Sequence, residues 1–383
     1  MKKILLIHNL YQQKGGEDIA VQNEVKVLQK SYNVKTIYFD NEINNYFLQL
    51  IYFLINKNLK SIKKIEKIYL EFEPDIVYMH NTWFKVSPQV FILLKKLDAK
   101  VILKLHNYRF FCTRYFLSRN HLKDFKKCKA CGYEGSKKAI FNKYYTTSYV
   151  KSLFLILYGK KYFNILKNGN LQILCLNNFQ KKFIENLGLN KNKISIVPNY
   201  SNFESNNIYN PDSEYIVYAG RISKEKGLES LIDSFTKIEK SNLKLKIIGD
   251  GPLLNSLKKS YRNENIEFLG KVSNIETVDI IKKSRAVVSA TSLYEVQPTL
   301  LCEASFNSIP SIFPDNGGIS EYFPSDYFLK YNLETDKELY QKLLYLQDKE
   351  ILKKASEEVK KFITTIINEE NYLNKLEAVF NVS

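Results

Sequence analysis

Short apolar runs that alternate with helical stretches determine the fold class of this chain. In the first half, β-branched and aliphatic residues fill brief segments, and each segment leads into a stretch with helical periodicity. Parallel strands need crossover connections, which are usually helices, so this alternation predicts an α/β fold with parallel sheets covered on both faces. The strand-like segments of the first half are residues 4–8, 34–39, 75–80, 101–106 and 172–176.

Two domains are expected from the length of the chain. Its 383 residues exceed the size at which a single core usually stops growing, and a hydrophobic content of 45% is enough for two cores. Val197-Pro198-Asn199 closes the first half, and residues 201–212 form a polar run with the composition of a linker. We therefore place the boundary at residue 203.

Two glutamates near the end of a predicted strand form the first candidate site. Residues 286–290 are apolar like a buried strand, and residues 299–306 are expected to form the next helix. Glu295 then lies in the strand-to-helix loop and Glu303 lies in the helix, at the sheet edge where ligands bind. Carboxylates accept hydrogens from hydroxyl groups, although two solvated acids are the simpler alternative.

Two cations follow the strand expected over residues 215–219. Gly220-Arg221 comes directly after it, and Lys226-Gly227 comes five residues later. An arginine that binds bidentately and a lysine that adds a point charge suit a diphosphate bound without a metal ion. An ordinary charged turn is the alternative.

Together, Gly-Arg-x4-Lys-Gly and Glu-x7-Glu resemble the motifs of the retaining glycosyltransferases of family 4 (GT4), and the likeness runs from end to end of the chain. The resemblance implies the GT-B fold, with two facing Rossmann-like domains and an interdomain cleft. Residues 1–203 would bind the acceptor and residues 204–361 the nucleotide sugar. The C-terminal helix, about 362–383, would cross back to the first domain.

The same resemblance implies an enzyme that moves a sugar from a UDP- or GDP-linked donor to a hydroxyl group, with retention of anomeric configuration. The acceptor would be a saccharide or a lipid-linked saccharide in surface polysaccharide, lipopolysaccharide or capsule biosynthesis. No cofactor is required. A GT-B-fold sugar-nucleotide epimerase or hydrolase is the first alternative. A basic nucleic-acid-binding protein is the second, although the scattered basic residues do not favour it.

The resemblance also assigns roles to residues. Arg221 and Lys226 would neutralise the leaving diphosphate, Glu295 would hold the donor sugar, Glu303 the ribose, and His106 would lie beside the transferred sugar. Further donor-binding candidates are Gly15, Gly16, Gly220, Gly249, Lys271, Val272, Gln297, Pro298, Thr299 and Leu300. The acceptor-binding candidates are Glu17, His106, Arg109 and Arg114. Val296 and Ser308 stand where the family usually has glycine.

Two features come from the residues alone. The Gly15-Gly16 pair at an expected helix start leaves backbone N–H groups to face an anion, or is a plain turn. Two interpretations fit Cys112, His121, Cys128 and Cys131. They form a Cys3His zinc site, or the cysteines are ordered thiols that bind no metal. Five cysteines without an export signal fit a reducing compartment.

The charge balance predicts an anionic partner, because 57 Lys and Arg face 40 Asp and Glu. Residues 137–167 mix lysine with aromatic residues, and residues 46–67 do so more weakly. Such segments are typical of a membrane-surface element, or of helices that cover a sheet. The N-terminal apolar run is too short for a signal peptide. We expect a cytoplasmic protein, peripheral on the inner face of the membrane if these segments touch lipid.

Overall fold

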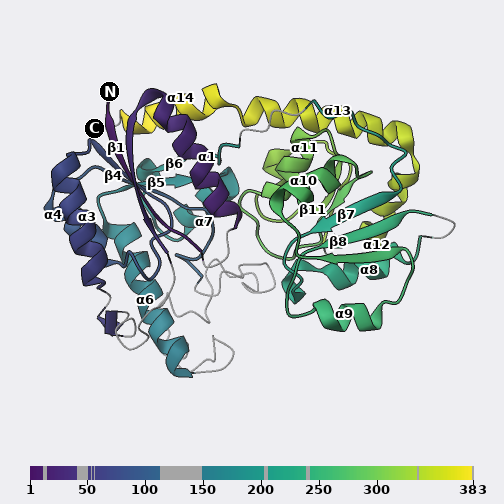
Figure 1. Ribbon diagram of the computed structural model, residues 1–383, viewed down its shortest axis with the longest axis horizontal. Helices are drawn as coiled ribbons and strands as arrows, with labels where there is room; N and C mark the ends of the chain where they lie inside the picture. The colour runs from purple at the N-terminus through teal and green to yellow at the C-terminus, as the bar shows by residue number, and fades with distance from the viewer. Residues whose placement is uncertain are drawn as a thin grey trace. The chain divides into compact units, whose positions relative to one another are not determined.

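The computed structural model describes residues 1–11, 15–40, 51–52, 54–55, 57–112, 149–201, 206–238, 242–333 and 336–381 (Figure 1). The chain divides into two compact units, Met1–Ser201 with Asn368–Ser383, and Asn202–Ile367. Each unit contains one six-stranded sheet with helices packed on it. The predicted α/β class with two Rossmann-like halves is therefore confirmed.

The sheet of the first unit has the strand order β2-β1-β3-β4-β5-β6, and every neighbouring pair is parallel. Near its centre, residues 4–7 of β1 have no solvent exposure, as expected for a parallel strand that is covered on both faces. The strands are β1 (Lys3–Asn9), β2 (Asn33–Phe39), β3 (Ile76–Met79), β4 (Val101–Lys104), β5 (Gln172–Cys175) and β6 (Ile194–Ile196).

The helices of the first unit include one from the far end of the chain. Tyr372, Leu376 and Val379 of the last helix share a buried cluster with Val21 and Leu28 of the first helix. Figure 1 shows the yellow C-terminal helix beside the purple N-terminal strands and helix. The helices are α1 (Gly16–Ser31), α3 (Leu59–Phe72), α4 (Gln89–Lys96), α6 (Tyr149–Asn168), α7 (Asn178–Asn186), the 3-10 helix η3 (Lys191–Lys193) and α14 (Glu369–Phe380).

The sheet of the second unit repeats the design, with the order β12-β11-β10-β7-β8-β9 and parallel pairs throughout. Its strands are β7 (Tyr215–Ala219), β8 (Lys244–Ile248), β9 (Ile266–Gly270), β10 (Val287–Val288), β11 (Ser311–Pro314) and β12 (Lys330–Tyr331). Its helices are η4 (Lys224–Lys226), α8 (Leu228–Phe235), α9 (Leu254–Ser260), α10 (Asn274–Lys282), α11 (Thr299–Phe306), η5 (Ile319–Tyr322), α12 (Asp336–Leu344), η6 (Tyr345–Gln347) and α13 (Lys349–Ile366).

The C-terminal segment expected to form one helix over about 362–383 instead contains the end of α13 (Lys349–Ile366) and then a second helix, α14. α13 ends at Ile366, and the Asn368 side chain then accepts a hydrogen bond from the backbone N–H of Asn371 at 2.8 Å. This N-cap satisfies one of the amides exposed at a new helix start. The break coincides with the return of the chain from the second unit to the first.

Helix α6 packs its aromatic residues into the first unit. Tyr162 is fully buried, and its ring stacks on Trp83 with centroids 5.2 Å apart. Tyr158 is buried against the same tryptophan, whereas Leu157 is half-exposed. These contacts fit a helix that covers the sheet, and membrane contact of residues 137–167 stays a prediction. In the part of the chain that the structure describes, no helix is both long and apolar enough to span a membrane.

Leu376 provides a test of the docking of α14 onto the first unit. The side chain has no solvent exposure, so Leu376→Ala leaves a cavity and should lower the free energy of unfolding of this unit by about 2–5 kcal/mol. Urea unfolding followed by fluorescence of Trp83, the one tryptophan of the chain, reports on the first unit. Lys375→Ala on the exposed face of α14 is the control, and equal stability of the two variants would contradict the assignment.

Candidate functional site

A pocket of about 190 Å³ lies at the carboxyl ends of β7 and β10 in the second unit. In parallel α/β sheets this edge is where ligands bind. Seven of the predicted donor-binding residues line it: Gly220, Lys226, Glu295, Gln297, Pro298, Thr299 and Leu300. The structure thus brings together the two motifs that lie about seventy residues apart in the sequence.

Lys226 and Glu295 form an ion pair in this pocket. The lysine Nζ lies 2.5 Å from Glu295 Oε1, which also accepts a hydrogen bond from the Thr291 hydroxyl at 3.2 Å. Both charged side chains are about a quarter exposed. Gly227 makes the tight turn after Lys226, because its φ is +66° and a Cβ would lie 2.0 Å from the Ala290 carbonyl oxygen. The glycine of the motif is therefore required by the backbone.

A glycine pair holds the backbone of Glu295. The amide of Gly318 donates to the Glu295 carbonyl at 2.9 Å, and Gly317 forms a parallel bridge with Glu295. A Cβ on Gly317 would lie within 3.0 Å of the Tyr294 and Glu295 backbones. The glycine pair that follows β11 therefore fixes the position of the loop that carries Glu295.

Glu303 differs from Glu295, because it is buried and has no counter-charge. Its side chain projects from α11 with 5% of the residue exposed, and burial raises its pKa to about 7. Within the described residues, no hydrogen bond or ion pair satisfies its carboxyl group. A buried, unpaired titratable group at a ligand-binding edge indicates a functional site.

The remaining predicted donor residues do not line the pocket. Arg221 and Lys271 are exposed, while Val272 is only partly covered. Arg221 follows β7, and its carbonyl oxygen accepts from the Tyr218 hydroxyl at 3.0 Å. Sequence reasoning missed six lining residues: Tyr218, Ala219, Val288 and Ser289 at the ends of β7 and β10, Leu301 in α11 and Ile319 in η5. Those at the ends of β7 and β10 are the ones that a strand-edge argument would have found.

The two departures from the family pattern have different local settings. Ser308 follows the end of α11 with φ +62°, the left-handed region in which helices commonly end on glycine. A serine in this conformation has a strained backbone, whereas glycine adopts it freely. This strain is the reason that glycine suits the position. Val296 is buried beside Glu295.

In the first unit, the structure brings Glu17 and Arg109, two of the predicted acceptor-binding residues, close to Asn107. Glu17 Oε2 accepts from the Tyr11 hydroxyl at 2.7 Å and from the Asn107 amide at 3.1 Å. The Arg109 guanidinium lies over the Tyr11 ring at 5.6 Å and over the Trp83 ring at 5.5 Å. Burial raises the pKa of Glu17. An acid and a cation are thus held close together, and Arg114 lies outside the described residues.

The helix start at Gly15 and Gly16 is partly occupied by the chain itself. Asp18 accepts a hydrogen bond from the Gly15 amide at 2.9 Å and pairs with His8 Nε2 at 2.9 Å. Burial raises the pKa of Asp18, but the bonds from His8 and Gly15 outweigh it and lower the pKa overall. The Gly15 amide is therefore not free to face an anion in this conformation, and donor binding by Gly15 and Gly16 stays a prediction.

His106 lies two residues after the end of β4 and pairs with a second histidine. His80 Nδ1 and His106 Nε2 are 2.8 Å apart. Burial, followed by the charge of Lys104, lowers the pKa of His106 well below its ordinary value. Burial does the same for His80. Both rings are therefore neutral near pH 7.

The zinc hypothesis is not decided by the geometry. Cys112 is buried, while His121, Cys128 and Cys131 lie outside the described residues. Among the residues that the structure does describe, no three metal-ligating side chains gather at one point. The site therefore stays a prediction.

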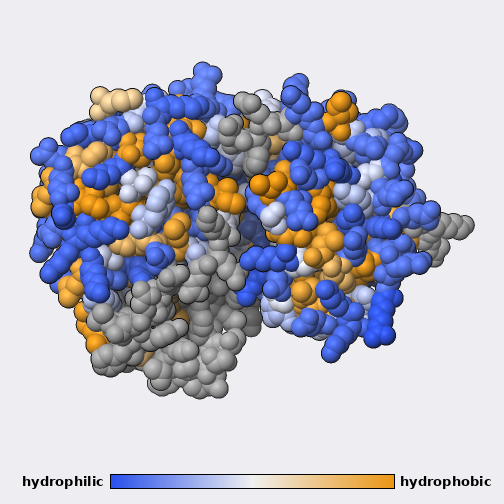
Figure 2. All heavy atoms as spheres, viewed as in Figure 1, coloured by the Kyte–Doolittle hydropathy of each residue, from blue (hydrophilic) through white to orange (hydrophobic). Residues whose placement is uncertain are grey.

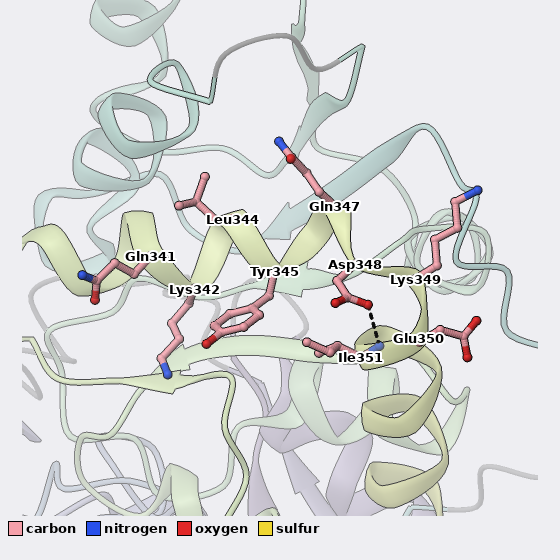
Figure 3. A pocket seen from close by; sticks show the side chains of 9 residues that line it. All are labelled: Gln341, Lys342, Leu344, Tyr345, Gln347, Asp348, Lys349, Glu350 and Ile351. Carbon is pink, nitrogen blue, oxygen red and sulfur yellow. Dashed lines mark hydrogen bonds between the residues drawn. The ribbon is translucent and has the colours of Figure 1, made fainter.

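A larger surface hollow lies at the corner between α12, η6 and α13, and Figure 3 shows the side chains that line it. Lys342 and Tyr345 point to one side, whereas Leu344 and Gln347 point to the other. The Asp348 carboxylate is engaged as the N-cap of α13, where it accepts from the Ile351 amide at 3.0 Å. These groups do not converge on a ligand, so the hollow is not the candidate site.

The comparison with protein families decides the assignment of the second unit. Residues 201–362, which include both motifs and the whole pocket, match the family described as glycosyl transferases group 1. These residues belong to that family. The group 1 domain accordingly coincides with the unit that holds Lys226, Glu295 and Glu303.

Relatives extend the likeness beyond the group 1 domain. An uncharacterized glycosyltransferase of Methanocaldococcus jannaschii is 30% identical over 280 residues, which are 68% of this chain and 60% of that protein. The amylovoran biosynthesis glycosyltransferase AmsD of Erwinia amylovora is 28% identical over 40% of this chain and 46% of its own length. The chain thus spans less than two thirds of the length of these relatives.

Solved structures agree over nearly the whole chain. The lipopolysaccharide outer core galactosyltransferase WaaB is similar with a TM-score of 0.66 and 16% identity, covering 98% of this chain and 99% of that one. Sucrose-phosphate synthase from Thermosynechococcus elongatus is similar with a TM-score of 0.72 and 13% identity. The match covers 99% of this chain and 98% of the synthase. Anabaena HepE in complex with UDP and glucose is similar with a TM-score of 0.67 and 12% identity, and the match covers 99% of each chain. The GT-B fold predicted for this chain is confirmed.

Glu303 makes the stability of the group 1 domain depend on pH. Its pKa in the folded state is about 7, above the ordinary 4.5, so ionisation weakens the fold and stability is lost as the pH rises through 7. Glu303→Gln cannot ionise. We expect it to be more stable than wild type by about 3 kcal/mol near pH 8.5, with the difference almost gone near pH 4.5.

Urea unfolding of both proteins across this pH range measures the effect. The exposed carboxylate Glu357 on α13 provides the control, because Glu357→Gln should show no such growth with pH. A constant difference between Glu303→Gln and wild type at all pH values would contradict the raised pKa.

Proposed function

We propose that this chain is a retaining glycosyltransferase. It transfers a sugar from a nucleotide diphosphate donor to a hydroxyl group of a saccharide or lipid-linked saccharide. The second unit binds the nucleotide sugar and the first unit binds the acceptor. The observation that carries the proposal is the arrangement of three charged residues in the group 1 domain: Lys226 paired with Glu295, and the buried, unpaired Glu303.

Glu303 supports a nucleotide ligand. A carboxylate that is largely buried and has no counter-charge among the described residues is costly to keep ionised. Two adjacent ribose hydroxyls satisfy such a group, because each donates a hydrogen to one of its oxygens. Binding then favours the ionised form, and the ligand recovers stability that the free protein lacks.

The Lys226–Glu295 pair supports a diphosphate beside a sugar. In the ligand-free protein each charge is neutralised by the other, at a site where both are partly in water. An ion pair of this kind contributes only about 0–1 kcal/mol, so it is broken at little cost. We propose that Lys226 then moves to the diphosphate and Glu295 to the hydroxyls of the sugar. Lys226 and Arg221 neutralise the charge that grows on the leaving group, which in turn takes the proton of the acceptor hydroxyl.

The first unit supplies groups suited to a polar acceptor. Glu17 accepts hydrogen bonds and Arg109 is a cation that lies over two aromatic rings, so the pair can bind hydroxyl and phosphate groups. We propose that they contact the acceptor and that His106 contacts the transferred sugar.

The relatives support the substrate class. AmsD is named for amylovoran biosynthesis and WaaB for the lipopolysaccharide outer core, and HepE was solved with UDP and glucose. We infer a UDP-linked donor in the first place, a GDP-linked one in the second, and a surface polysaccharide or lipopolysaccharide as the product.

Helix α3 supports contact with an anionic membrane. Ser61, Ile62 and Ile65 face the core, while the opposite face carries exposed lysines together with Leu59 and Leu70, which are 42% and 60% exposed. The exposed lysines are Lys60, Lys63, Lys64 and Lys67. Figure 2 shows apolar atoms among hydrophilic ones on the visible surface of this unit. Lysines around exposed leucines are typical of a surface that rests on lipid head groups.

The diphosphate role of Lys226 is tested by turnover. Lys226→Ala should lower it by roughly 10²–10³-fold, the effect of removing one preorganised donor. Lys224→Ala is a matched control, because Lys224 lies on the same 3-10 turn but is exposed and outside the pocket. Full activity of Lys226→Ala would overturn the assignment.

A panel of UDP- and GDP-linked sugars identifies the donor. The correct donor should raise the melting temperature of wild type and not that of Glu303→Ala. Nuclear magnetic resonance of the product should show the anomeric configuration of the donor. Rapid release of free sugar with no transfer to any acceptor would favour a hydrolase instead.

Membrane contact is tested by charge reversal on α3. Lysines near an anionic surface contribute about 1 kcal/mol each, so Lys60→Glu, Lys63→Glu and Lys67→Glu together should weaken binding to phosphatidylglycerol vesicles by at least about 10²-fold. Sedimentation with vesicles measures it, and added salt should weaken wild-type binding. Reversal of Lys237, Lys258 and Lys259 in the second unit is the control. Equal binding by both triple variants would exclude α3 as the contact surface.

A further inference from the structure

Two neighbouring residues after β10, Thr291 and Ser292, bond to the two motifs of the candidate site. The Ser292 amide and hydroxyl both donate to the Glu225 carbonyl oxygen, at 2.9 Å and 3.1 Å. Glu225 precedes Lys226 on the 3-10 helix η4, so these bonds help to fix the turn that carries the lysine. The segment that leads from β10 to Glu295 is therefore attached to the lysine turn as well.

The hydroxyl hydrogen of Thr291 is directed to the Glu295 carboxylate. The backbone amide of Leu293 donates to Thr291 Oγ1 at 3.2 Å, so the oxygen acts as an acceptor toward this amide. The one hydrogen of the hydroxyl is left for Glu295 Oε1, which also lies 3.2 Å away. Thr291 is 2% exposed, so bulk water does not compete for the bond. A hydroxyl that donates to a carboxylate makes a charge-assisted hydrogen bond.

The bonds to the Glu295 carboxylate end on one of its two oxygens. Lys226 Nζ lies 2.5 Å from Oε1, and the Thr291 hydroxyl donates to the same atom. Among the residues that the structure describes, none bonds to Oε2. About a quarter of the side chain is exposed, and the residue lines the pocket. Oε2 is therefore the oxygen available to a ligand.

A diphosphate in the pocket changes which bond holds the carboxylate. It attracts Lys226 and repels Glu295, because unlike charges attract and like charges repel at short range. Once the lysine has moved, the Thr291 hydroxyl is the bond that remains on Oε1 among the described residues. This hydroxyl is buried and carries no net charge, so the diphosphate does not displace it.

We propose that Thr291 is a positioning residue that keeps the Glu295 carboxylate directed at the donor sugar after Lys226 has moved to the diphosphate. Glu295 contacts the sugar, and Thr291 acts through Glu295. The inference rests on the proposed function for the identity of the ligand, a nucleotide diphosphate sugar. It adds the group that holds the acid in place when the ion pair is broken.

The alternative is that Thr291 only stabilises its own loop, through the Leu293 amide. Thr291→Val keeps the shape of the side chain but removes both the donor to Glu295 and the acceptor for Leu293. Thr291→Ser keeps both. A Glu295→Ala background separates the two roles, because an effect that passes through Glu295 disappears there, whereas an effect on the loop persists.

The first experiment needs no ligand. Crystal structures of Lys226→Ala, and of Lys226→Ala combined with Thr291→Val, show the Glu295 carboxylate without its lysine. We expect the carboxylate to stay within hydrogen-bond distance of Thr291 in the single variant and to leave its wild-type position in the double variant. A carboxylate that swings away in the single variant, or stays in place in both, would overturn the proposal whether or not the protein transfers a sugar.

The second experiment is calorimetry with two ligands, the nucleotide sugar that the melting-temperature panel selects and its nucleoside diphosphate, for example UDP-glucose and UDP. Thr291→Val should weaken binding of the nucleotide sugar about 10-fold, the effect of one hydrogen bond to a charged group, and change that of the diphosphate by less than about 2-fold. Thr291→Ser should restore most of the affinity. Thr236→Val is the control, because it removes a hydroxyl at the end of α8, outside the pocket. Equal weakening of both ligands by Thr291→Val would contradict the proposal.

The Glu295→Ala background decides through which group Thr291 acts. Adding Thr291→Val to Glu295→Ala should weaken binding of the nucleotide sugar by less than about 2-fold further, because the group on which Thr291 acts is gone. A further loss as large as the loss in wild type would assign Thr291 to the loop and overturn the proposal.

The outcomes separate this proposal from the proposed function. If no nucleotide sugar binds to wild type, the proposed function fails, and the crystal structures still decide whether Thr291 holds Glu295. If a sugar is transferred but Thr291→Val weakens both ligands alike, the role of Thr291 fails while the proposed function stands.

Discussion

Parallel strand pairing is the constraint on which the rest of this structure depends. Because every strand pair in both sheets runs in the same direction, the carboxyl ends of all strands in a sheet meet at one edge. The residues that follow those ends are brought together whatever their distance in the sequence. Lys226 after β7 and Glu295 after β10 meet in this way, and so do His80 after β3 and His106 after β4. Each unit therefore builds its polar site from the same geometric rule.

Much of this arrangement was predictable from sequence, because periodicity and glycine turns report on local backbone. The helix expected over residues 299–306 is α11, residue for residue, and the glycine of the Lys226-Gly227 motif makes the turn that such a motif implies. The strand expected over 286–290 is shorter, since only Val287 and Val288 pair with neighbours. Strand ends depend on partners from elsewhere in the chain, and a single sequence does not contain that information.

Side-chain pairing was the part that sequence could not supply. Nothing in the pattern around residue 24 distinguishes a solvated glutamate from one buried against Lys104, because the helix face on which it lies is set by tertiary packing. The same holds for Asp18, whose carboxylate occupies the helix start that the glycine pair was expected to leave open. Long-range electrostatics decides both cases, and it appears only when the fold is known.

The docking of α14 into the core of the first unit has a consequence for how the protein is made. A nascent chain usually folds its N-terminal domain while the rest is still being synthesised. Here the cluster around Val21 and Tyr78 is completed by Leu376 and Phe380, which leave the ribosome after the whole of the second unit. The first unit must wait, with part of its apolar surface uncovered, until the second has emerged. The first unit is therefore synthesised first but completes its core only after the second unit has left the ribosome.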